Sequence, residues 1–175
     1  MQFIKNRLTC LPDRFVAFTH EKIFEKLFNT QMLSSAVLTG GASATVTTGA
    51  AYNAIVNGVL SSKATGLTLA VLNGPTIQNT GLTCQAWIFT QDAVGNFYTL
   101  PGVPAATIAG IQLPTVYENA NGIGQSGLLQ VAVGMLTINN ASAGAFIPNT
   151  TLLNVAGLNP ILNNNVGPFY PLQIL

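Results

Sequence analysis

The stretch that decides the fold is residues 83–100, which read TCQAWIFTQDAVGNFYTL. Its first eight residues are rich in aromatic and branched apolar side chains, as expected for a half-buried strand. Residues 91–96 contain the turn formers Asp92 and Gly95, and residues 97–100 return to a strand pattern. The stretch therefore predicts a β-hairpin with strands at 83–90 and 97–100.

The same texture of short apolar runs between Gly, Asn and Pro extends through residues 36–156. Helical patterns are absent between the runs, which argues against a doubly wound α/β fold. Only residues 51–59 would also suit a short helix. We therefore expect an all-β fold, an antiparallel β-sandwich or jelly roll, with residues 128–138 as a central strand. The predicted strands are 42–48, 66–72, 82–90, 97–100, 107–113, 128–138 and 150–155.

The N-terminal residues form a region of different character. Residues 19–28 predict one short amphipathic helix, capped by Thr19 and carrying an apolar stripe. We expect residues 1–34 to form an arm, 35–156 the β-domain and 157–175 an extended C-terminal segment rich in Asn and Pro. The arm's stripe either packs on the protein's own core or docks on another subunit. The candidate docking residues are Phe15, Phe18, Ile23, Phe24, Leu27 and Phe28.

Charge is scarce and confined to the arm. Only 6% of the 175 residues are charged, with a formal net charge of +1, whereas average soluble domains carry roughly 25%. Eight of the eleven charged residues lie within residues 1–26, and Lys63 is the only lysine after Lys26. Such a chain is expected to associate with protein, most simply with copies of itself, and lacks the basic patch of a nucleic-acid binder.

The residues needed for catalysis or metal binding are also scarce. The chain has one histidine, His20, and the only acids outside the arm are Asp92 and Glu118, both in turn-like contexts. We therefore expect no catalytic site, no metal site, no cofactor and no small-molecule substrate. Cys10 and Cys84 follow no disulfide or metal-ligand spacing, so two free thiols are expected.

Neither a secretory signal nor a membrane helix is predicted. Asp13 and Arg14 interrupt the apolar run that a signal peptide would need. The longest nearly apolar run, residues 128–138, is much shorter than the roughly 20 residues of a membrane helix. We expect synthesis in the host cytoplasm.

The hairpin region 82–104, with its turn at 92–96, and the segment 136–140 resemble small head decoration (cement) proteins of tailed bacteriophages. The resemblance implies a virion protein on the outer capsid surface that bridges and stabilises neighbouring subunits. Its partners would be the major capsid protein and itself, as a homo-oligomer, with a trimer expected. It transfers no site residues.

Three other functions stay open. A single-jelly-roll capsid shell protein would fit the length, although the arm's net +2 is small for a genome-facing arm. A tail, fibre or adhesin component that binds a host glycan would use exposed aromatics such as Trp87, Tyr98 and Tyr117. A virion-associated hydrolase is the least favoured, because acids and histidines are so few.

Overall fold

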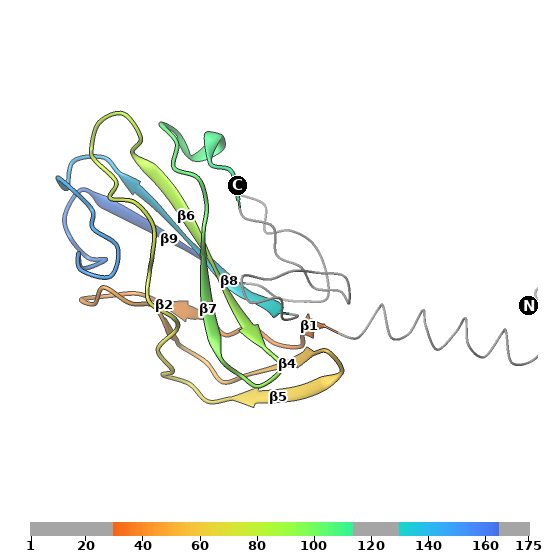
Figure 1. Ribbon diagram of the computed structural model, residues 1–175. Helices are drawn as coiled ribbons and strands as arrows, with labels where there is room; N and C mark the ends of the chain where they lie inside the picture. The colour runs from red at the N-terminus through yellow and green to blue at the C-terminus, as the bar shows by residue number, and fades with distance from the viewer. Residues whose placement is uncertain (1–29, 114–129, 165–175) are drawn as a thin grey trace, which may run out of the picture.

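A computed structural model describes residues 30–113 and 130–164 (Figure 1). These residues form antiparallel strands in three sheets, with the strand orders β1-β4-β5, β2-β3 and β7-β6-β8-β9. The predicted all-β, antiparallel class is confirmed. The elements are β1 (Gln31–Met32), β2 (Leu38–Thr39), β3 (Thr47–Thr48), β4 (Tyr52–Val56), β5 (Val59–Lys63), β6 (Cys84–Asp92), β7 (Phe97–Pro101), a 3-10 turn (Ile108–Gly110), β8 (Gln130–Asn140) and β9 (Leu158–Asn164).

The predicted hairpin and the predicted central strand are both present. β6 and β7 pair in antiparallel register, with Trp87 opposite Pro101 and Gln91 opposite Phe97. β8 lies between β6 and β9 in the four-stranded sheet. All nine residues of β6 are buried, because side chains pack against both faces of the sheet. Local sequence signals were sufficient for these three strands.

A β-bulge in β8 interrupts the alternation of its side chains between the two faces of the sheet. Phe89 pairs with Gly134 and Thr90 with Ala132, so Val133 is the extra residue. Val133 packs in the larger core cluster, whereas Met135 packs in the smaller cluster on the other face. Val131 and Val133 therefore share a face of the sheet with Leu136 and Ile138, whereas Met135 lies on the other face.

The bulge brings a glycine to a crowded position. A Cβ at Gly134 would lie 2.5 Å from Leu38 Cδ1 and 2.7 Å from the Asn163 carbonyl oxygen. Glycine therefore allows β2 to pack directly against β8.

Several predicted strands are irregular segments instead. Residues 66–72 contribute only the isolated bridge from Thr47 to Thr68, residues 107–113 contain the 3-10 turn and the bridge from Val103 to Gln112, and residues 150–155 form turns and bends. Of residues 42–48, only β3 is a strand. These runs are apolar because side chains such as Leu69, Leu72 and Leu153 insert into the core from loops. Their apolar content reflects packing and not strand pairing.

The alternative helix at 51–59 is also wrong, because these residues lie in the β4–β5 hairpin. Its two-residue turn is Asn57-Gly58, with φ of 52° and 75°. Positive φ at both positions defines the type I′ turn that favours Asn-Gly. Tyr52, Ala54 and Val56 alternate toward the core with a period of two.

Strand pairing crosses both predicted domain boundaries. β1 lies within the predicted arm and pairs with β4. β9 lies within the predicted C-terminal segment and pairs with β8 from Gly134 opposite Asn164 to Asn140 opposite Leu158. Residues 158–164 thus belong to the main sheet. The predicted helix at 19–28 lies outside the described residues.

Two clusters of buried side chains cover the two faces of the main sheet. The larger cluster joins Trp87 and Phe89 of β6 to Tyr52 and Val56 of β4. The smaller cluster joins Ile88 and Met135 to residues that include Leu100 and Ile111. In the described part of the chain, no helix has the length and apolarity to cross a membrane.

Candidate interaction surface

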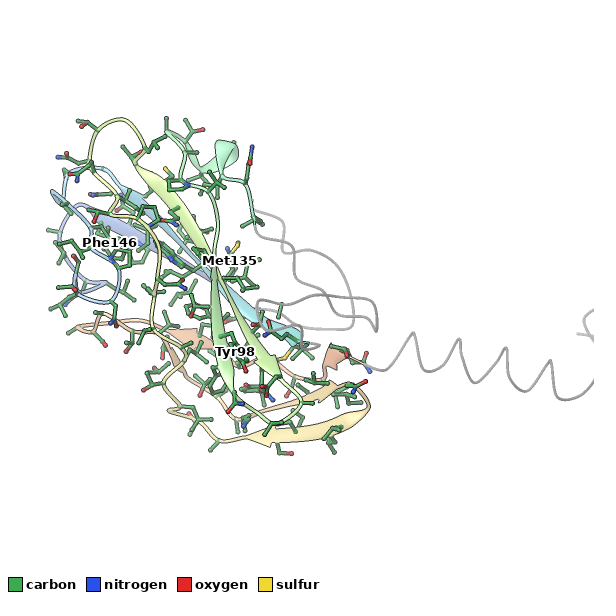
Figure 2. All side chains as sticks on the ribbon, in the orientation of Figure 1. Tyr98, Met135 and Phe146 are labelled. Atoms are coloured by element: carbon green, nitrogen blue, oxygen red, sulfur yellow. The ribbon has the colours of Figure 1, made fainter. Side chains whose placement is uncertain are left out.

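Asp92 closes the loop between β6 and β7. Its Oδ1 accepts hydrogen bonds from the backbone N–H groups of Val94, Gly95 and Asn96, at 3.0, 2.7 and 2.8 Å. Its Oδ2 accepts bonds from Asn96 Nδ2 at 3.0 Å and from the Tyr98 hydroxyl at 2.9 Å. Figure 2 shows Tyr98 on this hairpin, well away from Phe146. The predicted turn role of Asp92 is confirmed.

The hydrogen bonds determine the protonation of Asp92. Burial by itself would raise the pKa of this carboxyl. The bonds from Asn96, Tyr98 and Gly95 outweigh burial and hold its pKa below the ordinary value. The carboxylate is therefore ionised near neutral pH, and its oxygens are occupied within the loop.

Lys63 brings the only other described charge to the same loop. Its Nζ donates a hydrogen bond to the Gly95 carbonyl oxygen at 3.0 Å and lies 5.7 Å from the centre of the Phe97 ring. Lys63 and Asp92 are the only Asp, Glu, Lys or Arg residues within 30–113 and 130–164. Asp92 is only 2% exposed. The described surface is thus almost free of charge.

Large aliphatic side chains stand on this uncharged surface. Single exposed aliphatics are common on protein surfaces, but Val59 and Leu60 are adjacent on β5 and are 49% and 63% exposed. Burying such side chains against another protein removes apolar area from water. The exposed large aliphatics are Leu33, Val37, Val59, Leu60, Val71, Leu82, Val94, Val103, Ile147, Leu152 and Ile161.

A polar network connects β5 to the main sheet. The Tyr52 hydroxyl donates to Gln91 Oε1, and Gln91 Nε2 donates to Ser61 Oγ at 2.9 Å. Burial raises the pKa of Tyr52 far above its usual range, so the hydroxyl stays protonated and remains a donor. The network therefore fixes the position of β5 over β6.

Among the described residues that the sequence analysis considered for a site, Asp92 and Tyr98 are joined by a hydrogen bond. Trp87 is fully buried, donates from Nε1 to the Asn73 carbonyl oxygen and makes an edge-to-face contact with Phe146 at 5.8 Å. It cannot be an exposed glycan-binding aromatic, which corrects that expectation. Tyr117 and Glu118 lie outside the described residues, as do Phe15, Phe18, Ile23, Phe24, Leu27 and Phe28.

The described side chains offer little chemistry. No group of three or more His, Cys, Asp or Glu residues within them could hold a metal ion. Cys84 is a free thiol buried in β6, as predicted, and Cys10 lies outside the described residues. The features of the described surface that another protein could contact are therefore its exposed apolar side chains and its backbone groups.

The sequence reasoning missed β5 as a separate strand. The signal was the Asn57-Gly58 dipeptide, which follows the alternating Tyr52, Ala54 and Val56 and precedes the apolar Val59 and Leu60. Ser61, Ser62 and Lys63 reduce the apolar content of the second run, so composition alone did not identify it.

Comparisons of the chain with protein-family models, with curated proteins and with solved structures found no match.

Proposed function

We propose that this chain is a structural protein of a viral particle that decorates and stabilises the capsid by bridging neighbouring subunits. The observation that carries the proposal is the almost uncharged surface of the described domain, with its two charged residues engaged in one loop. Charged residues are depleted in the cores of protein interfaces, while apolar side chains are common there. A surface of this kind favours contacts with protein over contacts with ionic ligands.

The proposal includes the partners and architecture predicted from the sequence. The partners are copies of the chain, in a trimer, and the major capsid protein. The sandwich or jelly-roll architecture is also part of the proposal. It is supported by the shared core in which Met32 and Tyr52 of one sheet pack with Trp87 and Phe89 of another.

The test is quantitative mass spectrometry of purified particles from cells that produce the full-length chain. We expect the chain in fixed stoichiometry with a separate major capsid protein. A chain that is itself the most abundant shell protein would indicate a shell role, and a chain confined to tails would indicate adsorption. Either result, or absence from particles, would overturn the proposal.

A solution measurement tests the oligomeric state separately. Light scattering of the purified full-length chain over a dilution series is expected to give the mass of a trimer. A monomer at every concentration would contradict self-association of the uncharged surface.

A further inference from the structure

Within residues 30–113 and 130–164, β5 is a sheet edge without the usual protection. It is the last strand in the order β1-β4-β5 and lies at the outer margin of that sheet (Figure 1). Edge strands are usually protected by proline, bulges or charge. β9 contains Pro160, and next to β7 the Thr99 hydroxyl donates to the Ala70 carbonyl oxygen at 2.9 Å. β5 contains no proline, its ladder with β4 is regular, and its one charge, Lys63, is at its end.

The hydrogen bonds of β4 show which β5 groups face outward. The Leu33 N–H donates to the Asn53 carbonyl oxygen at 2.9 Å, so the Asn53 backbone faces β1. Asn53 is opposite Ser62, and this pair is therefore not hydrogen-bonded. Because backbone direction alternates along an antiparallel ladder, the N–H and C=O groups of Leu60 and Ser62 point away from β4. Neither residue has another backbone bond to the described part of the chain.

We propose that β5 pairs with β5 of a second copy of this chain, antiparallel and about a two-fold axis at Ser61. Leu60 would then be opposite Ser62 of the second copy, and Ser62 opposite its Leu60. Each pair exchanges two N–H···O bonds, so all the outward groups of both residues are used. The result is a continuous sheet across both copies.

Other registers satisfy fewer groups. A two-fold axis at Leu60 pairs Leu60 with its own copy, but Ser62 then lies opposite a residue outside β5 of the second copy. An axis at Ser62 pairs Ser62 with its own copy, and it is then Leu60 that lies opposite a residue outside β5. The Ser61 register also places Lys63 opposite Val59 of the second copy. The two ammonium groups then lie at opposite ends of the ladder, and the aliphatic part of each lysine can cover an exposed valine.

The occupant is a second copy because the edge is complementary to itself. Its two outward residues are symmetric about Ser61, and Val59 and Leu60 present apolar side chains on the two faces of the strand. A two-fold contact of this type repeats one surface on both partners. Five residues are a small interface, so we expect pairing at high protein concentration or within an assembly. In a trimer the same contact would join two trimers.

Cysteine cross-linking tests the register directly. In a Cys10→Ser background, Ser61→Cys places two thiols on a non-hydrogen-bonded pair with Cα atoms about 4.5 Å apart, which suits a disulfide. Ser62→Cys is the matched control, because its two copies would lie about 8 Å apart. We expect covalent dimers on mild oxidation of the full-length Ser61→Cys chain and few from Ser62→Cys. Equal yields, or more from Ser62→Cys, would overturn the proposal.

A proline variant tests the hydrogen bonds. Ser62→Pro removes an N–H that points away from β4, so the hairpin keeps its own bonds, while the pairing loses two bonds. We expect the dimer yield of Ser61→Cys to fall at least about tenfold when Ser62→Pro is added. Thermal unfolding establishes that each variant is folded.

Light scattering of the full-length chain without introduced cysteines provides a second readout. Leu60→Lys should weaken its concentration-dependent association, and this measurement needs no disulfide. Unchanged association in both Leu60→Lys and Ser62→Pro would overturn the pairing. These experiments use no particle, so their failure is distinct from failure of the capsid proposal.

Discussion

The β4–β5 and β6–β7 hairpins each pair five residues, but they differ in how their strands are covered. β6 has a hydrogen-bonded neighbour on each side and packed side chains on each face. Among the described residues, β5 has a hydrogen-bonded neighbour on one side, and Ser61 accepts a part-buried bond from Gln91. The comparison shows that pairing alone does not determine a strand's role, because coverage decides whether it stabilises the core or remains available for association.

The largest expected effect comes from the covered strand. Trp87→Ala should reduce the free energy of unfolding by about 3–5 kcal/mol, because it leaves a cavity where the indole packs against Phe146. Leu60→Ala on β5 is the matched control and should change it by less than about 0.5 kcal/mol. Urea unfolding followed by circular dichroism measures both. Similar losses would contradict the difference in coverage.

The loop of the covered hairpin should give the next largest effect. Asp92→Asn should lower the free energy of unfolding by about 2 kcal/mol at neutral pH, because the amide cannot accept all the bonds that the carboxylate accepts. Val94→Ala, in the same loop and 86% exposed, is the control and should have little effect. Equal values for the two variants would show that the bonds contribute little.

The same carboxylate predicts a pH dependence. The pKa of Asp92 is lower in the folded chain than the ordinary value of about 3.9, so the unfolded chain binds the proton more readily. The stabilisation is present above that ordinary value and is lost as pH falls through the folded pKa. Urea midpoints between pH 2.5 and 6 should fall more steeply for the native chain than for Asp92→Asn. Parallel profiles would contradict a lowered pKa.

The smallest effect concerns the turn of the open hairpin. Gly58→Ala should cost about 1 kcal/mol, because φ at Gly58 is 75° and a Cβ is unfavourable there. Gly41→Ala is the control, since an added Cβ there meets nothing within 4 Å. Thermal unfolding compares them. A neutral Gly58→Ala would indicate that the turn relaxes without strain.

Sequence reasoning succeeded where local signals were sufficient. The turn chemistry of Asp92 and Gly95 and the apolar run around Trp87 identified β6 and β7. It failed where pairing is long-range. β9 was assigned to a tail because Pro160 and the asparagines of this segment do not form a strand pattern. These residues form a strand through their pairing with β8. Leu69 and Leu153 were assigned to strands because loops that insert into a core are as apolar as strands.

The candidate surface was predictable only in its general character. Composition predicted a surface with few charges, but not that Lys63 and Asp92 serve the same loop. It also did not indicate that β5 would be the last strand of its described sheet, because an edge is a property of the sheet and not of the strand. The predicted docking residues, Phe15 to Phe28, stay predictions.

The bulge at Val133 has a consequence for tracing descent. A homologue with a regular strand here would be one residue shorter between Ala132 and Gly134 and would keep its inward and outward positions in step throughout. Aligned without a gap, the two sequences would agree on one side of this point, and on the other side residues of one face of the sheet would be matched with residues of the opposite face. Ancestry is therefore best sought with the two halves of β8 compared separately.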